Sequence, residues 1–537
     1  MRTGRILAVI LTVLAVLAGC GGDAERADQD RSLKPISGGT AVIGVISDID
    51  SWNEYLARQT SSLKVLRRIY LPLARETRES DAATPDLEAR IAESWSISDG
   101  GLAVTFRLRE MNWSDGTPLT ADDVRFTWTA QIAPEVAWSG ADVKSAIRDV
   151  QVDDDRTVTF LLHRAYPEMM VDIIAGGILP RHVFGKVPFE AWQTYDWSRA
   201  QVGSGPYLLQ SHRPGEEVRL TRNPAFYRQG LPHLDRLVFR IVPDIGNLIL
   251  QLQAGTVDLV DGIAPWQAES LMSAPSINIR EIRTLGYDYV GWNTARPPLD
   301  DPDVRMALTM AIDREGIVEE LLYGHGRVSP GPVPRNYRVA IDGDAWPYDP
   351  DEARRILTTK GFQPNAGILH RSGEPFEIEM TTNAGNELRS MVLVRVQEQL
   401  GRIGVKVKLL PPMQMGAFVA RNLSGDFDAY VGGWAFDGKV EIRSLFASSA
   451  TPPSGFNVVR YESDEVDQAL MDLEAAATLP DMKDALQRIH NRIHRDQPYT
   501  FLFESARLSA SSTRLHDLAL DVPGDALARF EQAWIDP

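Results

Sequence analysis

The feature that most limits the possible folds is an alternation of strand and helix patterns between Phe376 and Val431. Phe376–Thr381 and Val405–Leu410 have strand patterns, and the amphipathic stretch Glu387–Leu400 between them is long enough for a helix. Strands that alternate with helices are typical of layered α/β proteins, because each helix packs on the sheet that its neighbours form. Part of the N-terminal region shows the same alternation, so we predict an α/β fold.

Further elements follow from periodicity and capping signals. Thr120 and Asp123 form a capping box, and Asp301-Pro302 and Asp349-Pro350 each precede a helix. Strands are also expected at 39–45, 103–109, 157–162, 218–221, 237–242, 255–260 and 499–503. Helices are also expected at 63–70, 124–130, 245–254, 304–312, 353–357, 464–477 and 480–494.

Length and charge narrow the class of protein. A chain of 537 residues is too long for a single hydrophobic core and indicates roughly two to four domains. The net charge of −17 comes without a run of lysines or arginines. This speaks against nucleic acid as a partner.

The N-terminus has the pattern of an exported lipoprotein. A short positive region, Met1–Arg5, precedes the apolar run Ile6–Ala18, and Leu17-Ala18-Gly19-Cys20 resembles a bacterial lipobox. We expect residues 1–19 to be a signal peptide, Cys20 to be lipidated and residues 20–38 to be a flexible tether. A plain signal peptide with an incidental cysteine is the alternative.

Two further observations, on cysteine content and on apolar segments, concern the chain that follows the N-terminal segment. Cys20 is the only cysteine, which excludes an intrachain disulfide and a multi-cysteine metal site. No other segment reaches the roughly 18 apolar residues that a transmembrane helix needs. We therefore expect a soluble, multi-domain body in an extracytoplasmic or periplasmic compartment, held to the membrane by the acyl chains of Cys20.

The stretch Asp426–Asp437 combines a strand pattern with groups suited to a ligand. It holds, in order, Phe427, Ala429 and Val431 on one strand face, then Gly432, Gly433, Trp434 and Asp437. The strand is expected to break at the two glycines, which let another backbone come close. With an aromatic wall and one charge beyond it, the stretch suits a groove that receives an extended ligand as an added strand. The alternative is a packed corner with Trp434 in the core.

Enzyme signatures are incomplete. Ser61 and Lys64 match the Ser-x-x-Lys motif of penicillin-binding proteins, but neither Lys-Thr-Gly nor Ser-Asp-Asn accompanies it. No Walker A loop, dinucleotide fingerprint or His-Glu-x-x-His motif occurs. The sequence therefore favours a binding protein over an enzyme, without a cofactor.

Two pairs of titratable residues are interpreted as structural. His490 and His494 lie four apart on a predicted helix, but neighbouring arginines oppose a divalent cation. We expect exposed histidines on a solvated face and no metal. Asp122 and Asp123 are expected to cap a helix, with no partner that would shift a pKa.

Several stretches together resemble one family, the extracytoplasmic solute-binding proteins of peptide and nickel ABC importers, known as family 5. The block Trp113–Val124 (WSDGTPLTADDV) carries the signature of that family. The other matching stretches, in the order of the family, are Ala92–Trp95, Phe106–Arg109, Gly203–Tyr207, Asn223–Tyr227, Gln253–Asp258, Asn293–Asp301, Val304–Leu308, Ala311–Arg314 and Tyr348–Pro350. Together they run over roughly residues 40–510.

The resemblance implies a bilobal periplasmic-binding-protein fold of class II, cluster C type, with an inserted domain and three domains in all. Lobe 1 is then discontinuous, at 39–83, 201–284 and 498–537, the inserted domain covers 84–200, and lobe 2 covers 285–497. The ligand binds in a cleft between the lobes, which close by a hinge motion.

The resemblance also implies site residues. Gly433-Trp434-Ala435 corresponds to the strand whose backbone pairs with a peptide, and Asp437 to an aspartate that binds the ligand's α-ammonium. Thr60 corresponds to a facing main-chain contact from lobe 1. The sequence departs from the family pattern after Asp437, where Lys439 follows and would either neutralise Asp437 or contact an anionic ligand. No histidine lies near this segment, which speaks against nickel.

The implied function is capture of a small peptide or peptide-like solute for an ABC permease with its ATPases, by a monomer that breaks no bond. A sensor or scaffold of the same fold, and an exported hydrolase using Ser61 and Lys64, are the alternatives.

Overall fold

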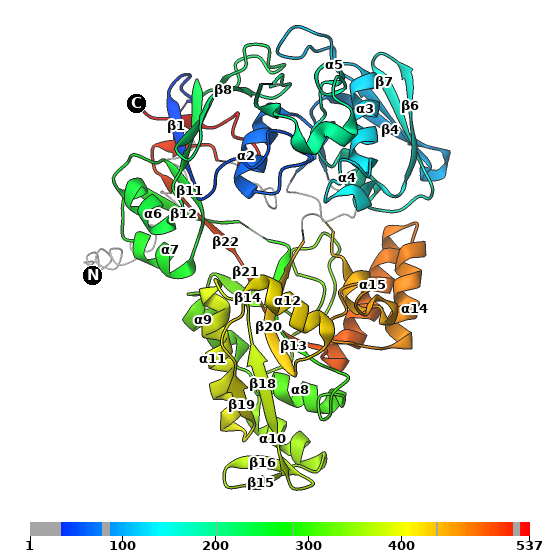
Figure 1. The fold of residues 1–537 in the computed structure, drawn as a ribbon, viewed down its shortest axis with the longest axis vertical. Helices are drawn as coiled ribbons and strands as arrows, with labels where there is room; N and C mark the ends of the chain where they lie inside the picture. Colours follow the sequence, from blue (N-terminus) through cyan, green and yellow to red (C-terminus); the bar gives the residue numbers. More distant parts are fainter. Residues whose placement is uncertain (1–33, 78–85, 200, 283, 437–438, 519–526) are drawn as a thin grey trace, which may run out of the picture.

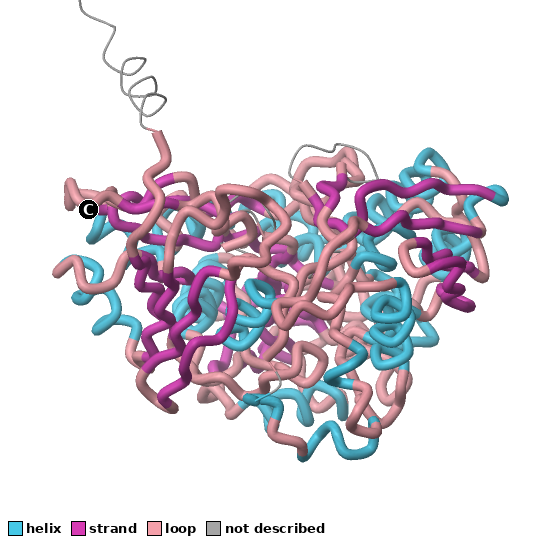
Figure 2. Tube along the Cα trace, turned by 90° about the horizontal axis from the view of Figure 1, so that it is seen from above, coloured by secondary structure: helices cyan, strands magenta, loops and turns pink. Residues whose placement is uncertain are grey.

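The computed structural model describes residues 34–77, 86–199, 201–282, 284–436, 439–518 and 527–537. Three main sheets of seven, four and six strands organise the chain. We call the parts built on them lobe 1, the insert and lobe 2. Figure 1 shows lobe 2 below lobe 1 and the insert, which lie side by side, and Figure 2 shows the strands of lobe 1 on the left and those of the insert on the right. No helix among the described residues is long and apolar enough to cross a membrane.

Lobe 1 is assembled from distant segments of the chain. Its sheet has the order β12-β22-β11-β1-β10-β9-β8, with β1 parallel to both neighbours. The strands are β1 (Thr40–Val45), β8 (Tyr207–Arg213), β9 (Glu217–Arg222), β10 (Arg236–Ile241), β11 (Leu259–Ile263), β12 (Ile277–Ile282) and β22 (Arg507–Ser512). The helices are α2 (Thr60–Ile69), α6 (Ile245–Gln253) and α7 (Pro265–Leu271). Ala41, Ile43 and Val45 alternate into the core, as the sequence predicts.

The insert is an antiparallel sheet of order β4-β5-β7-β6 with helices packed against it. Its elements are β4 (Ala92–Ser98), β5 (Ala103–Leu108), α3 (Ala121–Ile132), β6 (Ile147–Asp154), β7 (Thr157–Leu162), α4 (Met169–Ile174) and α5 (Arg181–Phe184). One continuous apolar cluster joins lobe 1 to the insert, and it includes Ile43 and Tyr70 from the first and Phe106 and Phe184 from the second. A small sheet of β2 (Ala74–Glu76) and β3 (Leu87–Ala89) lies where the chain passes between them.

Lobe 2 is a mixed sheet of order β14-β21-β13-β20-β18-β19. Its strands are β13 (Gly286–Trp292), β14 (Gly326–Val328), β18 (Glu377–Thr381), β19 (Lys406–Leu409), β20 (Ala429–Ala435) and β21 (Tyr499–Ser505). Its helices are α8 (Pro302–Met310), α9 (Arg314–Leu321), α10 (Pro350–Thr359), α11 (Glu387–Arg402), α12 (Met415–Ser424), α13 (Ile442–Phe446), α14 (Asp464–Ala475) and α15 (Leu479–Asp496). Two apolar clusters belong to this lobe, and all their described members come from it.

Two pairs of strands connect lobe 2 to lobe 1. Strand β12 of lobe 1 is followed by β13 of lobe 2, and β21 of lobe 2 is followed after Ala506 by β22 of lobe 1. Figure 1 shows β21 and β22 running from one lobe into the other.

The predicted α/β fold is confirmed, with small changes at element ends. The strand predicted at 255–260 begins only at Leu259, because Gly255 has a φ of +70° and forms a turn after α6. The capping box of Thr120 and Asp123 is present, and it starts α3 at Ala121.

Candidate ligand-binding site

Strand β20 lies in the interior of the lobe 2 sheet and continues through its two glycines. It pairs with β13 along its whole length, from Trp292↔Ala429 to Gly286↔Ala435. The prediction that the strand breaks at Gly432 and Gly433 is wrong, because each glycine keeps the backbone groups that the ladder needs. The prediction that Phe427 shares a face with Val431 is also wrong. Phe427 precedes the strand and packs with Tyr430 in the other apolar cluster.

The backbone N–H and C=O groups of β20 point alternately towards β13 and towards the opposite side of the strand, where β18 lies. At the two ends of the strand, the Phe436 amide donates to the Leu285 carbonyl (2.7 Å) and the Asn293 amide donates to the Asp428 carbonyl (2.9 Å). Even-numbered residues therefore bond to β13. Because successive residues point in opposite directions, the odd-numbered residues present their N–H and C=O groups on the other side.

That other side is only partly occupied. Strand β18 pairs with β20 at Ala429 and Tyr430 alone and ends at Thr381. The Val431 carbonyl accepts a hydrogen bond from the Thr382 hydroxyl (2.9 Å). Beyond it, no strand of the described chain pairs with β20 on this side, so Gly433 and Ala435 lie on an open ladder edge. We call Gly433–Ala435 the open edge.

An arginine from α11 crosses beside the open edge. The Arg389 Nε donates to Asp288 Oδ1 (2.6 Å) and Nη1 donates to Asn383 Oδ1 (3.1 Å). A Cβ at position 433 would lie 2.2 Å from Arg389 Nη2 and 2.8 Å from Asp288 Oδ1. A side chain at position 433 would therefore displace the Arg389–Asp288 pair, which favours glycine there for a packing reason. Burial raises the pKa of Asp288, and the Arg389 guanidinium opposes that shift.

Trp434 points to the opposite face of the sheet from Gly433, and it is half-buried. Its Nε1 lies 3.4 Å from the Tyr499 hydroxyl, and its ring meets Phe456 edge-on at 6.1 Å. Tyr499 in turn stacks on Tyr289 at 3.8 Å. The tryptophan is thus partly a core residue and partly an accessible wall.

The remaining predicted site residues are not gathered in one place by the described contacts. Ala435 is exposed, and Thr60 is exposed at the first turn of α2 in lobe 1. Asp437 and Cys20 lie outside the described residues. Lys439 forms an ion pair with Asp172 of the insert (Nζ–Oδ2 2.8 Å), a partner that the sequence did not indicate.

The Ser-x-x-Lys match does not form a catalytic pair. The Lys64 ammonium contacts the buried Asp261 carboxylate at 2.6 Å, and Arg507 contacts the same oxygen. The Ser61 hydroxyl pairs with Ser47 at 2.9 Å. Lys64 therefore has a structural role beside the connecting strands, where its ammonium is paired with Asp261.

The prediction that His490 is exposed is wrong. His490 is 1% exposed, and both ring nitrogens lack a hydrogen-bond partner in the described structure. Gly331 and Gly343 leave room for the ring, because a Cβ at either would lie within 2.7 Å of it. Burial lowers the pKa of His490 to about 4. His494 stacks on Trp346 at 5.1 Å.

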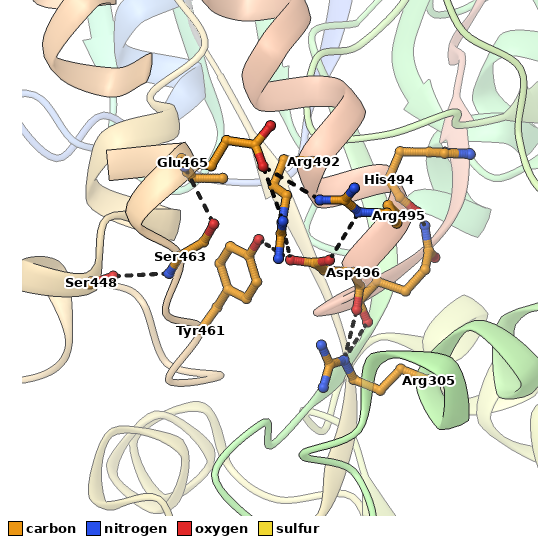
Figure 3. Close-up of polar contacts among 11 residues, drawn as sticks. Arg305, Ser448, Tyr461, Ser463, Glu465, Arg492, His494, Arg495 and Asp496 are labelled. Atoms are coloured by element: carbon orange, nitrogen blue, oxygen red, sulfur yellow. Dashed lines mark hydrogen bonds and ion pairs between the residues drawn. The ribbon is translucent and has the colours of Figure 1, made fainter. Parts of the chain in front are cut away.

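The arginines near these histidines bind carboxylates. The buried Asp496 accepts from the Tyr461 hydroxyl (2.6 Å) and pairs with Arg492 (2.7 Å), while its carbonyl accepts from Arg305 of α8 (2.9 Å) (Figure 3). This network fastens the end of α15 to the lobe. No group of three or more His, Cys, Asp or Glu side chains in the described ranges could hold a metal ion.

Asp123 does more than cap α3. Its carboxylate also accepts hydrogen bonds from Trp113 Nε1 (3.2 Å) and the Arg181 amide (2.8 Å). Burial raises its pKa, contrary to the expectation that nothing shifts it. The signature block Trp113–Val124 is therefore a folding element of the insert.

Sequence reasoning missed Arg389, Asp288 and Asp172. Each lies in an ordinary helix or strand pattern without a local signal, and only the fold brings each beside the open edge or Lys439. If the apolar stretch around Asp288, which forms β13, had been predicted as a buried strand, its single charge would have marked Asp288 as a residue in need of a partner.

Comparisons with known proteins agree with this architecture. The model of the bacterial extracellular solute-binding proteins, family 5 Middle, matches residues 86–451. The oligopeptide-binding protein AppA of Bacillus subtilis is 30% identical over 94% of this chain and 93% of its own length. The glutathione-binding protein GsiB of Salmonella typhimurium is 26% identical over 88% and 90%. The solved structure of AppA from Bacillus subtilis with a nonapeptide has a TM-score of 0.73 at 27% identity, covering 94% of this chain and 100% of that one.

Proposed function

The chain belongs to the bacterial extracellular solute-binding proteins of family 5, and we propose that it captures a small peptide or peptide-like solute between its lobes. The names of its relatives support this choice, since AppA is described as binding oligopeptides and GsiB as binding glutathione, a peptide-like solute. Delivery to the permease and ATPases of an ABC importer completes the proposed role, and binding breaks no bond.

The observation that carries the proposal is the open edge. Gly433 and Ala435 present their N–H and C=O groups two residues apart on an unoccupied ladder edge, which is the spacing that an added strand requires. A peptide laid along it would gain main-chain hydrogen bonds whatever its side chains. Trp434 would border one side chain, and Arg389 lies beside the same edge.

Two further residues complete the proposed site. Asp437 follows the open edge by two positions and would bind the free amine of a peptide, because a buried ammonium needs a charged partner. Thr60 would supply the facing contact from lobe 1.

We propose hinge closure at the connecting strands, with the domains at 39–83, 201–284 and 498–537 (lobe 1), 84–200 (insert) and 285–497 (lobe 2). The sheets of lobe 1 and of the insert each fall within one of these divisions, which supports them, whereas the sheet of lobe 2 takes β21 (Tyr499–Ser505) from beyond residue 497. We further propose that the protein is a monomer anchored through lipidated Cys20 on the extracytoplasmic side.

The test begins with the ligand. Mass spectrometry of the solute that co-purifies, followed by calorimetric titration with that solute and with pools of dipeptides, tripeptides and longer peptides, should identify a peptide.

The variant Ala435→Pro then removes one N–H from the open edge and leaves the β13 ladder intact. We expect roughly a tenfold loss of peptide affinity, the effect of about one hydrogen bond, and no change for Ala435→Ser. Equal affinity in both variants would contradict strand addition.

Asp437→Ala tests the amine anchor. We expect a loss of roughly 2–5 kcal/mol for a peptide with a free N-terminus. The same peptide with an acetylated N-terminus should bind both proteins equally, and a loss for both peptides would point to a structural role instead.

A further inference from the structure

Three carboxylates lie on the surface of lobe 1 and the insert that contacts lobe 2. Glu76 comes from β2, Glu168 precedes α4, and Asp172 lies within α4. Figure 1 shows α4 on the side of the insert nearest to lobe 2. The side chains of Glu168 and Asp172 are only 10% and 4% exposed. Two carboxylates so deeply buried require positive partners.

Lobe 2 supplies those partners from two separate loops. The Arg338 Nη2 lies 3.1 Å from Glu76 Oε2, and its Nε lies 3.8 Å from Glu168 Oε1. The Lys439 Nζ lies 2.8 Å from Asp172 Oδ2. The Tyr337 hydroxyl adds a hydrogen bond to Glu168 Oε1 at 2.7 Å. We call these six residues the interlobe network, which joins lobe 1, the insert and lobe 2.

Both halves of the interlobe network are held in place by their own lobes. Tyr337 is 5% exposed in an apolar cluster of lobe 2. On the other half, the Tyr166 hydroxyl donates to Asp172 Oδ2 at 2.6 Å. The Lys144 ammonium donates to the carbonyls of Asp172 and Ile173 at the end of α4 (2.6 and 3.0 Å). The side chains of Tyr337 and Asp172 therefore lose little entropy when the halves meet.

The charges are complementary, with three carboxylates on one half and two cations on the other, and the Lys144 ammonium lies beside Asp172 on the carboxylate half. When the lobes separate, a negative surface and a positive surface face each other across water, and their fields attract. When the lobes meet, desolvation opposes that attraction, and burial indeed raises the pKa values of Glu76 and Glu168. The net gain of such pairs is small, so the contact can form and break repeatedly.

We propose that the interlobe network is a latch that forms on closure and sets the balance between open and closed lobes, with Lys439 and Arg338 as its closing cations. It deepens the proposed function, because it regulates the same site through the closed state. It also assigns Lys439 to Asp172 instead of to the ligand. A ligand that selects the closed state would bind more weakly to a protein whose latch is removed, although no ligand contact has changed.

The test uses ligand-free protein. The full chain with Cys20→Ser is labelled at Ile97→Cys on the insert and Met471→Cys on lobe 2, both of which are exposed positions. The distance between the labels is then measured by energy transfer or pulsed electron spin resonance. We expect Lys439→Met and Asp172→Asn each to lower the ratio of closed to open protein about three- to tenfold. The charge swap of Asp172→Lys with Lys439→Asp should restore it.

The matched control is Lys408→Met, which removes an ion pair with Glu379 inside lobe 2 (2.5 Å) and should leave the distances unchanged. Thermal unfolding of each variant shows that it is folded. Distances that are the same in wild type, Lys439→Met and Asp172→Asn would overturn the latch. Because no ligand is needed, failure of peptide binding would reject the proposed function alone, whereas peptide binding with unchanged distances would reject the latch alone.

Discussion

The joint between lobe 1 and the insert differs in chemistry from the joint between this pair and lobe 2. One apolar cluster runs through the first joint without interruption, whereas the apolar clusters of lobe 2 contain no described residue from elsewhere. The second joint includes two connecting strand pairs, the charged interlobe network and further polar contacts, such as that of Arg164 of the insert with the Glu474 carbonyl of lobe 2. The chemistry of the two joints supports the proposal that the first stays closed while the second opens.

The physical reason is the cost of separating each joint. Exposing apolar surface costs about 25 cal/mol per Å², which soon amounts to several kcal/mol for aromatic side chains. When ion pairs separate, their charged groups are hydrated again, and this hydration offsets much of the Coulomb energy that is lost. A protein that captures and releases a solute by the proposed hinge closure needs one joint of each kind, since the site must keep its shape while the lobes move.

The largest expected effect comes from breaking the apolar joint. Phe184 is fully buried, stacks on Trp197 of the insert at 4.4 Å and meets Tyr70 of lobe 1 edge-on at 6.1 Å. We expect Phe184→Ala to lower the free energy of unfolding by about 3–5 kcal/mol in urea denaturation. Leu250→Ala, at a position that is 62% exposed, is the matched control and should change it by less than about 0.5 kcal/mol. A similar loss in both variants would contradict the continuous core.

A second prediction concerns the pH dependence of stability in lobe 2, where His490 is buried. The folded pKa of His490, about 4, lies below the ordinary value of 6.5, so its neutral form stabilises lobe 2 above pH 6.5. That stability is lost as the pH falls from 6.5 towards 4, by roughly 2–3 kcal/mol near pH 4.5. Thermal unfolding of wild type and His490→Gln at pH 7 and pH 4.5 measures it, and the variant should lose less stability in acid. Parallel losses would show that His490 does not titrate on unfolding.

A third prediction concerns the insert's half of the latch. Lys144 is 2% exposed, and its Nζ bonds to three carbonyls at the end of α4, including that of Ala175 at 2.9 Å. We expect Lys144→Met to cost about 1–3 kcal/mol of stability, because carbonyls lose a buried donor. The closed fraction of ligand-free protein should fall as well, since α4 carries Asp172. A stability loss with an unchanged closed fraction would show that the position of α4 does not influence the latch.

The sequence predicted the parts of this molecule that depend on local patterns. The alternating strands around Ile43 and the Thr120–Asp123 capping box were found because their signals lie within a few residues of each other. The pattern of Asp426–Asp437 indicated a groove for an added strand and left a packed corner as the alternative, and the family resemblance favoured the groove. Nothing in that stretch states that β18 ends at Thr381, so the open side of β20 could not be predicted from it.

The charged contacts between lobes could not be predicted in this way. The Lys439–Asp172 pair joins residues 267 positions apart, and neither residue has a pattern that names its partner. The burial of His490 was missed for the same reason, because the space for its ring is made by Gly331 and Gly343 from a distant loop. Such contacts depend on how whole lobes pack.

The smallest expected effect is that of salt concentration, and it distinguishes the charged joint from the apolar joint most directly. Salt screens charges but leaves apolar contacts intact or slightly strengthened, and at 0.5 M salt the screening length is only about 4 Å. Raising the salt concentration should therefore lower the closed fraction of ligand-free protein by about two- to fourfold, an effect below about 1 kcal/mol, in the labelled protein described above. The urea midpoint of the lobe 1 and insert unit should stay the same or rise. In Lys439→Met with Asp172→Asn, the response of the closed fraction to salt should become smaller, because Arg338 still pairs with Glu76 and Glu168. Adding Arg338→Met should abolish the response. A response that persists in this triple variant would mean that other charges hold the lobes together, and the contrast between the two joints would then rest on a wider surface than the interlobe network.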